Sequence, residues 1–193
     1  KRPAGHQSGR GFHRRLLGRV VTSGRASLGS VAALGLMSCA FASGLSATAY
    51  ANTTTSTQPS VTFDDALSAY SSGDKFTALS NAKVAARAGS SDAAVMAGYI
   101  LRKGETGAVN LSEAKSWYMQ AANKNHPDAL VALGEMAIKN EAGLTQSDAV
   151  SYLTRASDMG RTDAMRALSD LYRTGQGTAP SAKKSESLLK KAS

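Results

Sequence analysis

Cysteine and histidine are scarce in this chain of 193 residues, which has one cysteine and three histidines. The single thiol, Cys39, lies inside an apolar run near the N-terminus, so cleavage after that run would remove it. An intramolecular disulfide, a cysteine nucleophile and a cysteine-ligated metal are therefore excluded. Beyond residue 51 the only histidine is His126, and one histidine without cysteine excludes most zinc sites.

Acidic residues are missing from the N-terminal segment. All 14 lie after Ala51, whereas the first 51 residues contain seven of the 23 basic residues. The net charge of +9 therefore comes mostly from this segment, and the rest of the chain is nearly neutral. A nucleic-acid-binding domain needs a basic patch on its folded part, so we predict no nucleic-acid partner.

Catalytic motifs are also missing. His126 lies in a turn before Pro127, and Asp128 is better explained as an acidic residue at a helix start. A general base would need a partner and an orienting group. The glycines in 104–107 and 175–177 lack the Gly-Lys-Ser/Thr ending and the preceding strand of a phosphate loop. We predict a protein that is not an enzyme and that has no cofactor and no metal site.

The first 51 residues have the order of a secretory signal peptide. A basic stretch ends near Arg25, an uncharged segment covers 28–45, and small residues lead to Ala49-Tyr50-Ala51. The apolar run is interrupted by Gly and Ser, which makes it a weak membrane span. We predict that 1–51 is an export leader cleaved after Ala51, and that the mature protein is periplasmic or secreted.

An alternative for the leader remains open. Leu36-Met37-Ser38-Cys39 resembles a bacterial lipobox, in which Cys39 would become a lipidated N-terminus. Several acyl chains would then anchor the protein at the envelope. In either case we predict membrane contact only through the leader or this anchor.

Residues 52–62 are rich in Ser and Thr, and this composition predicts a flexible linker.

The last hundred residues of the chain are repetitive. Asp-Ala pairs recur at 92–93, 128–129 and 163–164, and Ala-Ala or Ala-Ser pairs recur at 121–122, 156–157 and 192–193. A period of about 35 residues predicts an array of helix pairs. No alternating β-branched run predicts a sheet. We predict an all-α fold, a short right-handed α-solenoid of helix-turn-helix units at about 63–89, 91–125, 126–160 and 161–193.

Each unit divides into two helices. In the last three units the pattern predicts first helices over about 92–103, 127–139 and 162–174, and second helices over about 111–124, 146–159 and 180–192. In the first unit it predicts helices over 63–70 and 75–88, with Asp74 as N-cap and Gly89 as the stop. Trp117 recurs as Tyr152 and Leu188, so we predict that it packs between helices.

The units resemble Sel1-like repeats, which are related to tetratricopeptide repeats but have a longer, glycine-containing loop. The match rests on Asp92-Ala93, Ala97-Gly98, Gly104 and Trp117-Tyr118 in one unit, and on 172–177 and 190–192 in the last. The middle unit diverges, with Asn140 in place of the loop glycine. The resemblance implies an adaptor or scaffold role. Some secreted members carry a disulfide in each repeat, and this chain lacks those cysteines, which puts activities such as penicillin binding in doubt.

We predict that a partner binds the concave face lined by the first helices. At three levels along that face the equivalent positions are Val95, Val131 and Arg166; Tyr99, Glu135 and Asp170; and Arg102, Ile138 and Arg173. The predicted function is an exported, non-enzymatic protein–protein interaction or scaffold module of the bacterial cell envelope. Two alternatives are a cell-wall protein that binds or processes peptidoglycan or a β-lactam-like ligand, using Glu135, Asp170 and Arg166, and a regulator of a membrane sensor. Ordinary exposed helix residues would show the same mixture of side chains.

Overall fold

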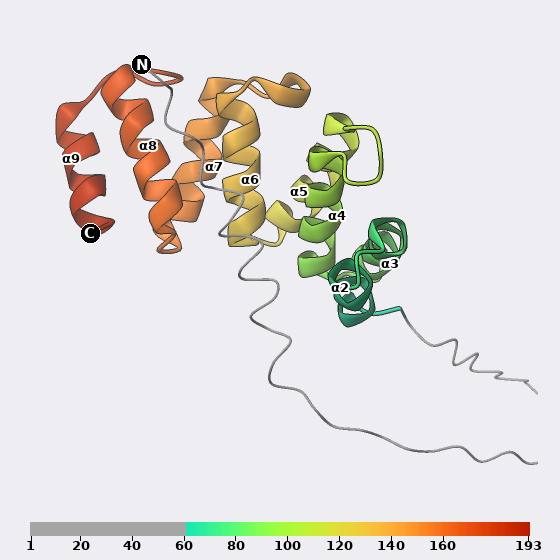
Figure 1. The fold of residues 1–193 in the computed structure, drawn as a ribbon. Helices are drawn as coiled ribbons and strands as arrows, with labels where there is room; N and C mark the ends of the chain where they lie inside the picture. Colours follow the sequence, from blue (N-terminus) through green and yellow to red (C-terminus); the bar gives the residue numbers. More distant parts are fainter. Residues whose placement is uncertain (1–60) are drawn as a thin grey trace, which may run out of the picture. The chain divides into compact units, whose positions relative to one another are not determined.

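The computed structural model describes residues 61–193 (Figure 1). The predicted leader, Cys39 and almost all of the predicted linker lie outside the described residues. The remainder forms one compact unit of the chain, and it is this unit that is described below.

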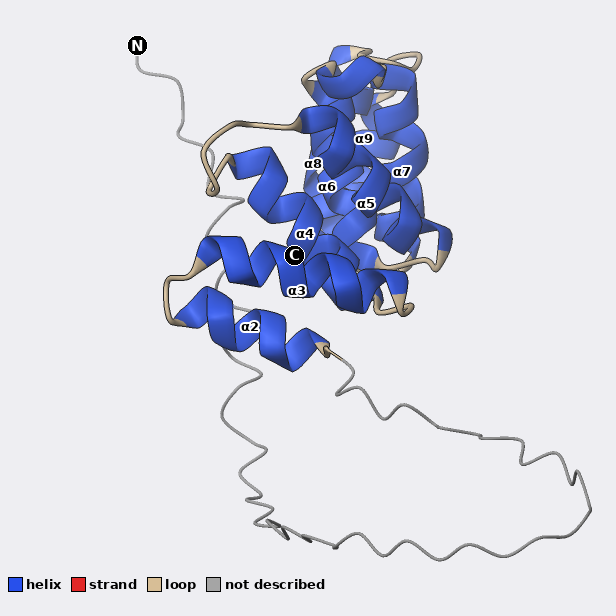
Figure 2. Ribbon diagram, turned by 90° about the vertical axis from the view of Figure 1, so that its right-hand side faces the viewer, coloured by secondary structure: helices blue, strands red, loops and turns tan. Residues whose placement is uncertain are grey.

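Eight α-helices follow one another in the described residues, and none of these residues forms a strand (Figure 2). The helices are α2 (Phe63–Ser71), α3 (Lys75–Arg87), α4 (Ser91–Lys103), α5 (Leu111–Asn123), α6 (Pro127–Ile138), α7 (Gln146–Asp158), α8 (Thr162–Thr174) and α9 (Ala182–Lys191), with a short 3-10 turn, η1 (Glu141–Gly143), after α6. Each helix packs against the one before it and the one after it. The predicted all-helical repeat array is confirmed. None of these helices is long and apolar enough to cross a bilayer.

Capping residues explain why the helix ends were predictable. The Asp74 carboxylate accepts a hydrogen bond from the Thr77 amide at 3.0 Å and begins α3, as the sequence indicated. Pro127 is the first residue of α6, where its missing N–H leaves no bond unmade. Gly89 follows the end of α3 with a φ of +104°. In the last three units the observed helices differ from the predicted ranges by at most two residues at either end.

The loops inside the last three units have equal length, at 104–110, 139–145 and 175–181. Gly104 and Gly175 leave their helices in the left-handed region, with φ of 68° and 74°. Asn140 adopts the same conformation in the middle unit, with φ of 55°. Asparagine tolerates this region better than most residues, so the unit that departs from the glycine pattern still leaves its first helix through a left-handed residue.

Small residues let the two helices of a unit approach closely. A Cβ atom on Gly98 of α4 would lie 2.9 Å from the Tyr118 ring, and one on Gly134 of α6 would lie 2.6 Å from Leu153. The aromatic residue that packs between the helices is Tyr118, which is 2% exposed, and not Trp117 as the sequence indicated. Trp117 itself is half-buried, and its Nε1 donates to Glu113 Oε1 at 3.2 Å.

Candidate partner-binding surface

The predicted concave positions differ in exposure along the array. At the first level Val95 and Val131 are only 2% and 9% exposed, so they belong to the core. Arg166, at the equivalent position of α8, is exposed. The apolar members of this level therefore offer a partner almost no surface.

The other two levels show the same gradient. Tyr99 and Glu135 are half-buried, whereas Asp170 is exposed. At the third level Arg102 of α4 and Ile138 of α6 are half-buried, and Arg173 of α8 is exposed. The cause is the repeat architecture, because each unit covers a side of the preceding one, and within residues 61–193 no unit follows α8 and α9.

The structure brings two of the predicted residues together. Arg102 at the end of α4 donates from Nη1 to Glu135 Oε2 at 3.0 Å and from Nε to Glu141 Oε2 at 3.1 Å. Burial alone would lower the pKa of Arg102, but the carboxylates of Glu141 and Glu135 outweigh it and raise that pKa. The guanidinium therefore remains charged, and it fastens the second unit to the third.

A similar contact joins the first unit to the second. The Tyr70 hydroxyl donates to Glu105 Oε1 at 3.1 Å. Burial raises the pKa of Tyr70 and of Tyr99, and the charge of Glu105 raises both further. Both phenols thus stay protonated at neutral pH, where they serve as hydrogen-bond donors rather than as bases. Sequence reasoning missed Glu105 and Glu141, although each directly follows the left-handed loop residue of its unit, Gly104 or Asn140.

A second set of contacts lies where the first helices begin. His126 Nε2 lies 3.2 Å from Asp92 Oδ1, and one unit later Arg161 pairs with Asp128. Arg161 also pairs with Asp163 at 2.6 Å. Burial would lower the pKa of Arg161, but the hydrogen bonds to Asp163 and Asp128 raise it. His126, which precedes α6, and Arg161, which precedes α8, therefore each contact an aspartate of the preceding unit.

This setting gives His126 a structural role. Its Nδ1 atom is buried and has no hydrogen-bond partner among the described residues, while Nε2 is occupied by Asp92. Neither nitrogen is presented to a substrate, which a general base requires. No group of three or more His, Cys, Asp and Glu side chains in the described part of the chain is placed to hold a metal ion.

The arrangement matches known repeat proteins. The Sel1 repeat family matches residues 91–126 and 162–193, and the divergent third unit lies between the two matches. None of the curated proteins matches the chain.

Two solved structures show the same fold. A protective antigen of uropathogenic Escherichia coli with an SLR fold aligns with a TM-score of 0.62 and 20% identity over 67% of this chain. A Sel1 repeat protein from Oxalobacter formigenes aligns with a TM-score of 0.60 and 21% identity over 67% of this chain. The alignments span 29% and 54% of the lengths of those two proteins. At this identity the likeness concerns the fold alone.

Proposed function

We propose that this array of Sel1 repeats is a non-enzymatic protein-interaction module of the bacterial cell envelope, which binds its partner on the concave face of its first helices. The observation that carries the proposal is the exposed charged row on α8. Arg166, Asp170 and Arg173 are all exposed on one helix, and Asp170 continues the half-buried level of Tyr99 and Glu135. Alternating charges of this kind select a partner by electrostatic complementarity.

Export to the envelope is part of the proposal, and it rests on the order of basic, apolar and small residues in 1–51. Mass spectrometry of the mature N-terminus tests it. A chain that begins at Asn52 supports cleavage after Ala51, whereas a lipidated Cys39 would make the protein an anchored lipoprotein. An unprocessed N-terminus in the cytoplasmic fraction would contradict both.

Site-specific photo-cross-linking in the native cells tests the binding face. We would place a photoreactive amino acid at Glu135 or Asp170, and at Ser116 or Ser151 of the second helices as controls, since both serines are exposed. The proposal expects a discrete protein adduct from the first pair and not from the controls. Equal labelling of all four positions would contradict it. Retention of peptidoglycan fragments by the purified domain, without a protein adduct, would favour the cell-wall alternative instead.

A further inference from the structure

A lysine and a glutamate flank the left-handed residue at the end of the first helix in both the second and the third unit. They are Lys103 and Glu105 in one unit, and Lys139 and Glu141 in the other. The last unit has uncharged residues at the equivalent positions. The pattern therefore belongs to the two units that have a packed neighbour on both sides within the described residues.

The array itself uses the two glutamates. Glu105 Oε1 accepts from the Tyr70 hydroxyl of the first unit at 3.1 Å, and the other carboxylate oxygen of Glu105 is buried. Glu141 Oε2 accepts from Arg102 Nε at 3.1 Å, and the Glu141 side chain is only 20% exposed. Neither carboxylate is therefore well placed to receive a donor from a partner.

The two lysines face solvent instead. Lys103 is exposed, and its ammonium group lies 5.9 Å from the centroid of the Tyr99 ring, near the outer limit of a cation–π contact. The Lys139 side chain is 49% exposed, and its Nζ lies 4.0 Å from Glu141 Oε1, which is longer than a hydrogen bond. Both ammonium groups thus keep hydrogen-bond donors for a ligand.

These lysines extend the face on which we propose that the partner binds. Lys103 lies four residues after Tyr99, and Lys139 lies four residues after Glu135, so each pair shares one side of its helix. Tyr99 is half-buried, and so is Ile138, the chain neighbour of Lys139. A partner on this face would therefore meet two ammonium groups next to partly exposed apolar surface.

Charge complementarity defines what fits this arrangement. Ammonium groups with unused donors pair with carboxylates of a partner. Residues 99–105 and 135–141 contain three cations and three carboxylates, so the attraction comes from individual contacts rather than from net charge. A densely charged polyphosphate would meet the glutamates as well as the lysines. A protein segment, in contrast, can place a few carboxylates opposite the lysines and an apolar side chain opposite Tyr99.

We propose that Lys103 and Lys139 bind carboxylates of an acidic segment of the partner protein, and that an apolar residue of this segment packs against Tyr99. The two lysines lie one repeat apart, so the segment would span the second and third units. The inference rests on the proposed function, because it names the chemistry of the partner at the same face.

The test uses the full chain in its native cells, with a photoreactive phenylalanine derivative in place of Tyr99. We expect a protein adduct whose cross-linked segment, mapped by mass spectrometry, contains carboxylates. A synthetic peptide of that segment should bind the purified protein. K103E/K139E should weaken its Kd about tenfold, because one exposed charge pair changes an affinity only a few-fold and two pairs are reversed. K103Q/K139Q, which removes the charges without reversing them, should have a smaller effect.

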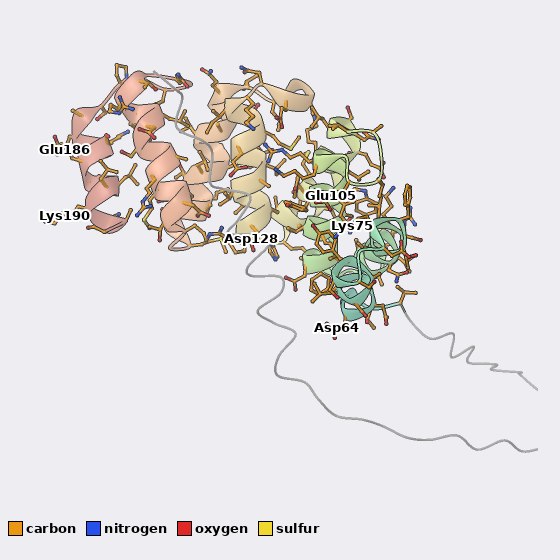
Figure 3. The ribbon with its side chains drawn as sticks, in the orientation of Figure 1. Asp64, Lys75, Glu105, Asp128, Glu186 and Lys190 are labelled. Atoms are coloured by element: carbon orange, nitrogen blue, oxygen red, sulfur yellow. The ribbon has the colours of Figure 1, made fainter. Side chains whose placement is uncertain are left out.

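The matched control is K183E/K190E, which makes the same change in net charge as K103E/K139E. Both control lysines are exposed on α9, and Lys190 lies at the opposite end of the array from Glu105 (Figure 3). This variant should leave the Kd of the peptide unchanged. Thermal melts monitored by circular dichroism check that each variant is folded.

Four results would overturn this inference and leave the proposed function standing. They are a mapped segment without carboxylates, an adduct with a second copy of the chain, equal effects of K103E/K139E and K183E/K190E on the Kd, and no adduct at Tyr99 while the label at Glu135 captures a protein. No protein adduct at either Tyr99 or Glu135 would overturn the proposed function, and this inference with it.

Discussion

The Leu153 side chain packs directly against the backbone of Gly134. An added Cβ would lie 2.6 Å from two carbon atoms of Leu153, which is fully buried and has little room to move. Alanine is the better helix former by about 1 kcal/mol. We nevertheless expect G134A to lower the free energy of unfolding by about 1–3 kcal/mol, the usual cost of an overpacked core. Urea unfolding measures the change.

The control for this prediction is the same substitution beside a smaller neighbour. In an L153A background the added methyl group has space, so G134A should be neutral or stabilising there. The difference between the two backgrounds gives the coupling between the residues. An equal cost in both would show that the contact with Leu153 is not the cause.

Ala142 adopts a backbone conformation that its side chain disfavours. It lies in η1 with a φ of 52°, in the left-handed region that costs a non-glycine residue roughly 1–2 kcal/mol. We expect A142G to stabilise the protein by about 1 kcal/mol, since the backbone oxygen that accepts from Lys115 Nζ is retained. A132G within α6 is the matched control and should destabilise by about 1 kcal/mol. Thermal unfolding that moved in the same direction for both would refute the argument.

Among the helices, α7 begins with a reciprocal cap. Thr145 accepts from the Asp148 amide, and the Asp148 carboxylate accepts from the Thr145 amide at 2.8 Å. These hydrogen bonds, from the backbone first and from the hydroxyl second, hold the pKa of Asp148 below its usual value. A lowered pKa stabilises the folded state above the unfolded pKa of about 3.9 and loses that effect as pH falls through the folded pKa.

D148A should therefore reduce the free energy of unfolding at pH 6, by less than about 1 kcal/mol because the carboxylate is exposed to solvent screening. The gap between variant and parent should shrink as the pH falls below about 4. Unfolding curves at pH 6, 4 and 2.5 measure it. A gap that stayed constant with pH would mean that the charge of Asp148 contributes nothing.

A comparison of Arg102 with Arg173 tests how much the stabilisation that an arginine provides depends on the position of its unit in the array. Each is the last residue but one of the first helix of its unit, but the Arg102 side chain is 13% exposed between two carboxylates and the Arg173 side chain is 64% exposed. We expect R102A to cost about 2 kcal/mol, because Glu135 and Glu141 would be left half-buried without their partner. R173A should change stability by less than about 0.5 kcal/mol.

Chemical denaturation of the two variants gives the comparison, and E135A/E141A added to R102A should recover part of the loss. If R102A and R173A had similar effects, Arg102 would not be fastening the two units.

The helices themselves could be predicted because their signals are local. Asp74, Pro127 and Gly89 act within one turn of their own position, so helix ends followed directly from the sequence. The candidate site was harder to predict. Whether Val95 or Arg166 reaches solvent depends on whether another unit covers it, and that is a property of the array rather than of the helix. The buried Tyr118 was missed for a related reason, since the recurrence of Trp117 does not say which of two adjacent aromatics faces the core.

Across the whole array, stability should vary from unit to unit, because each unit gains support only from its neighbours. Helix α4 belongs to a unit with neighbours on both sides and buries eight residues, whereas α9 buries Ser185 alone. Amides in α9 should therefore exchange with deuterium through local opening, well before those of α4 and α6. Peptide-level hydrogen exchange measured by mass spectrometry gives this order.

A matched pair of core substitutions makes the same point quantitatively. L168A removes a buried side chain of α8, and M96A removes one of α4. We expect L168A to speed exchange mainly in α8 and α9 and to leave α4 almost unchanged, because opening the last unit does not uncover the second. M96A should instead speed exchange in several units, since the second unit supports neighbours on both sides. If both substitutions accelerated all helices equally, the described residues would unfold as a single cooperative block, and the last unit would not open independently of the rest.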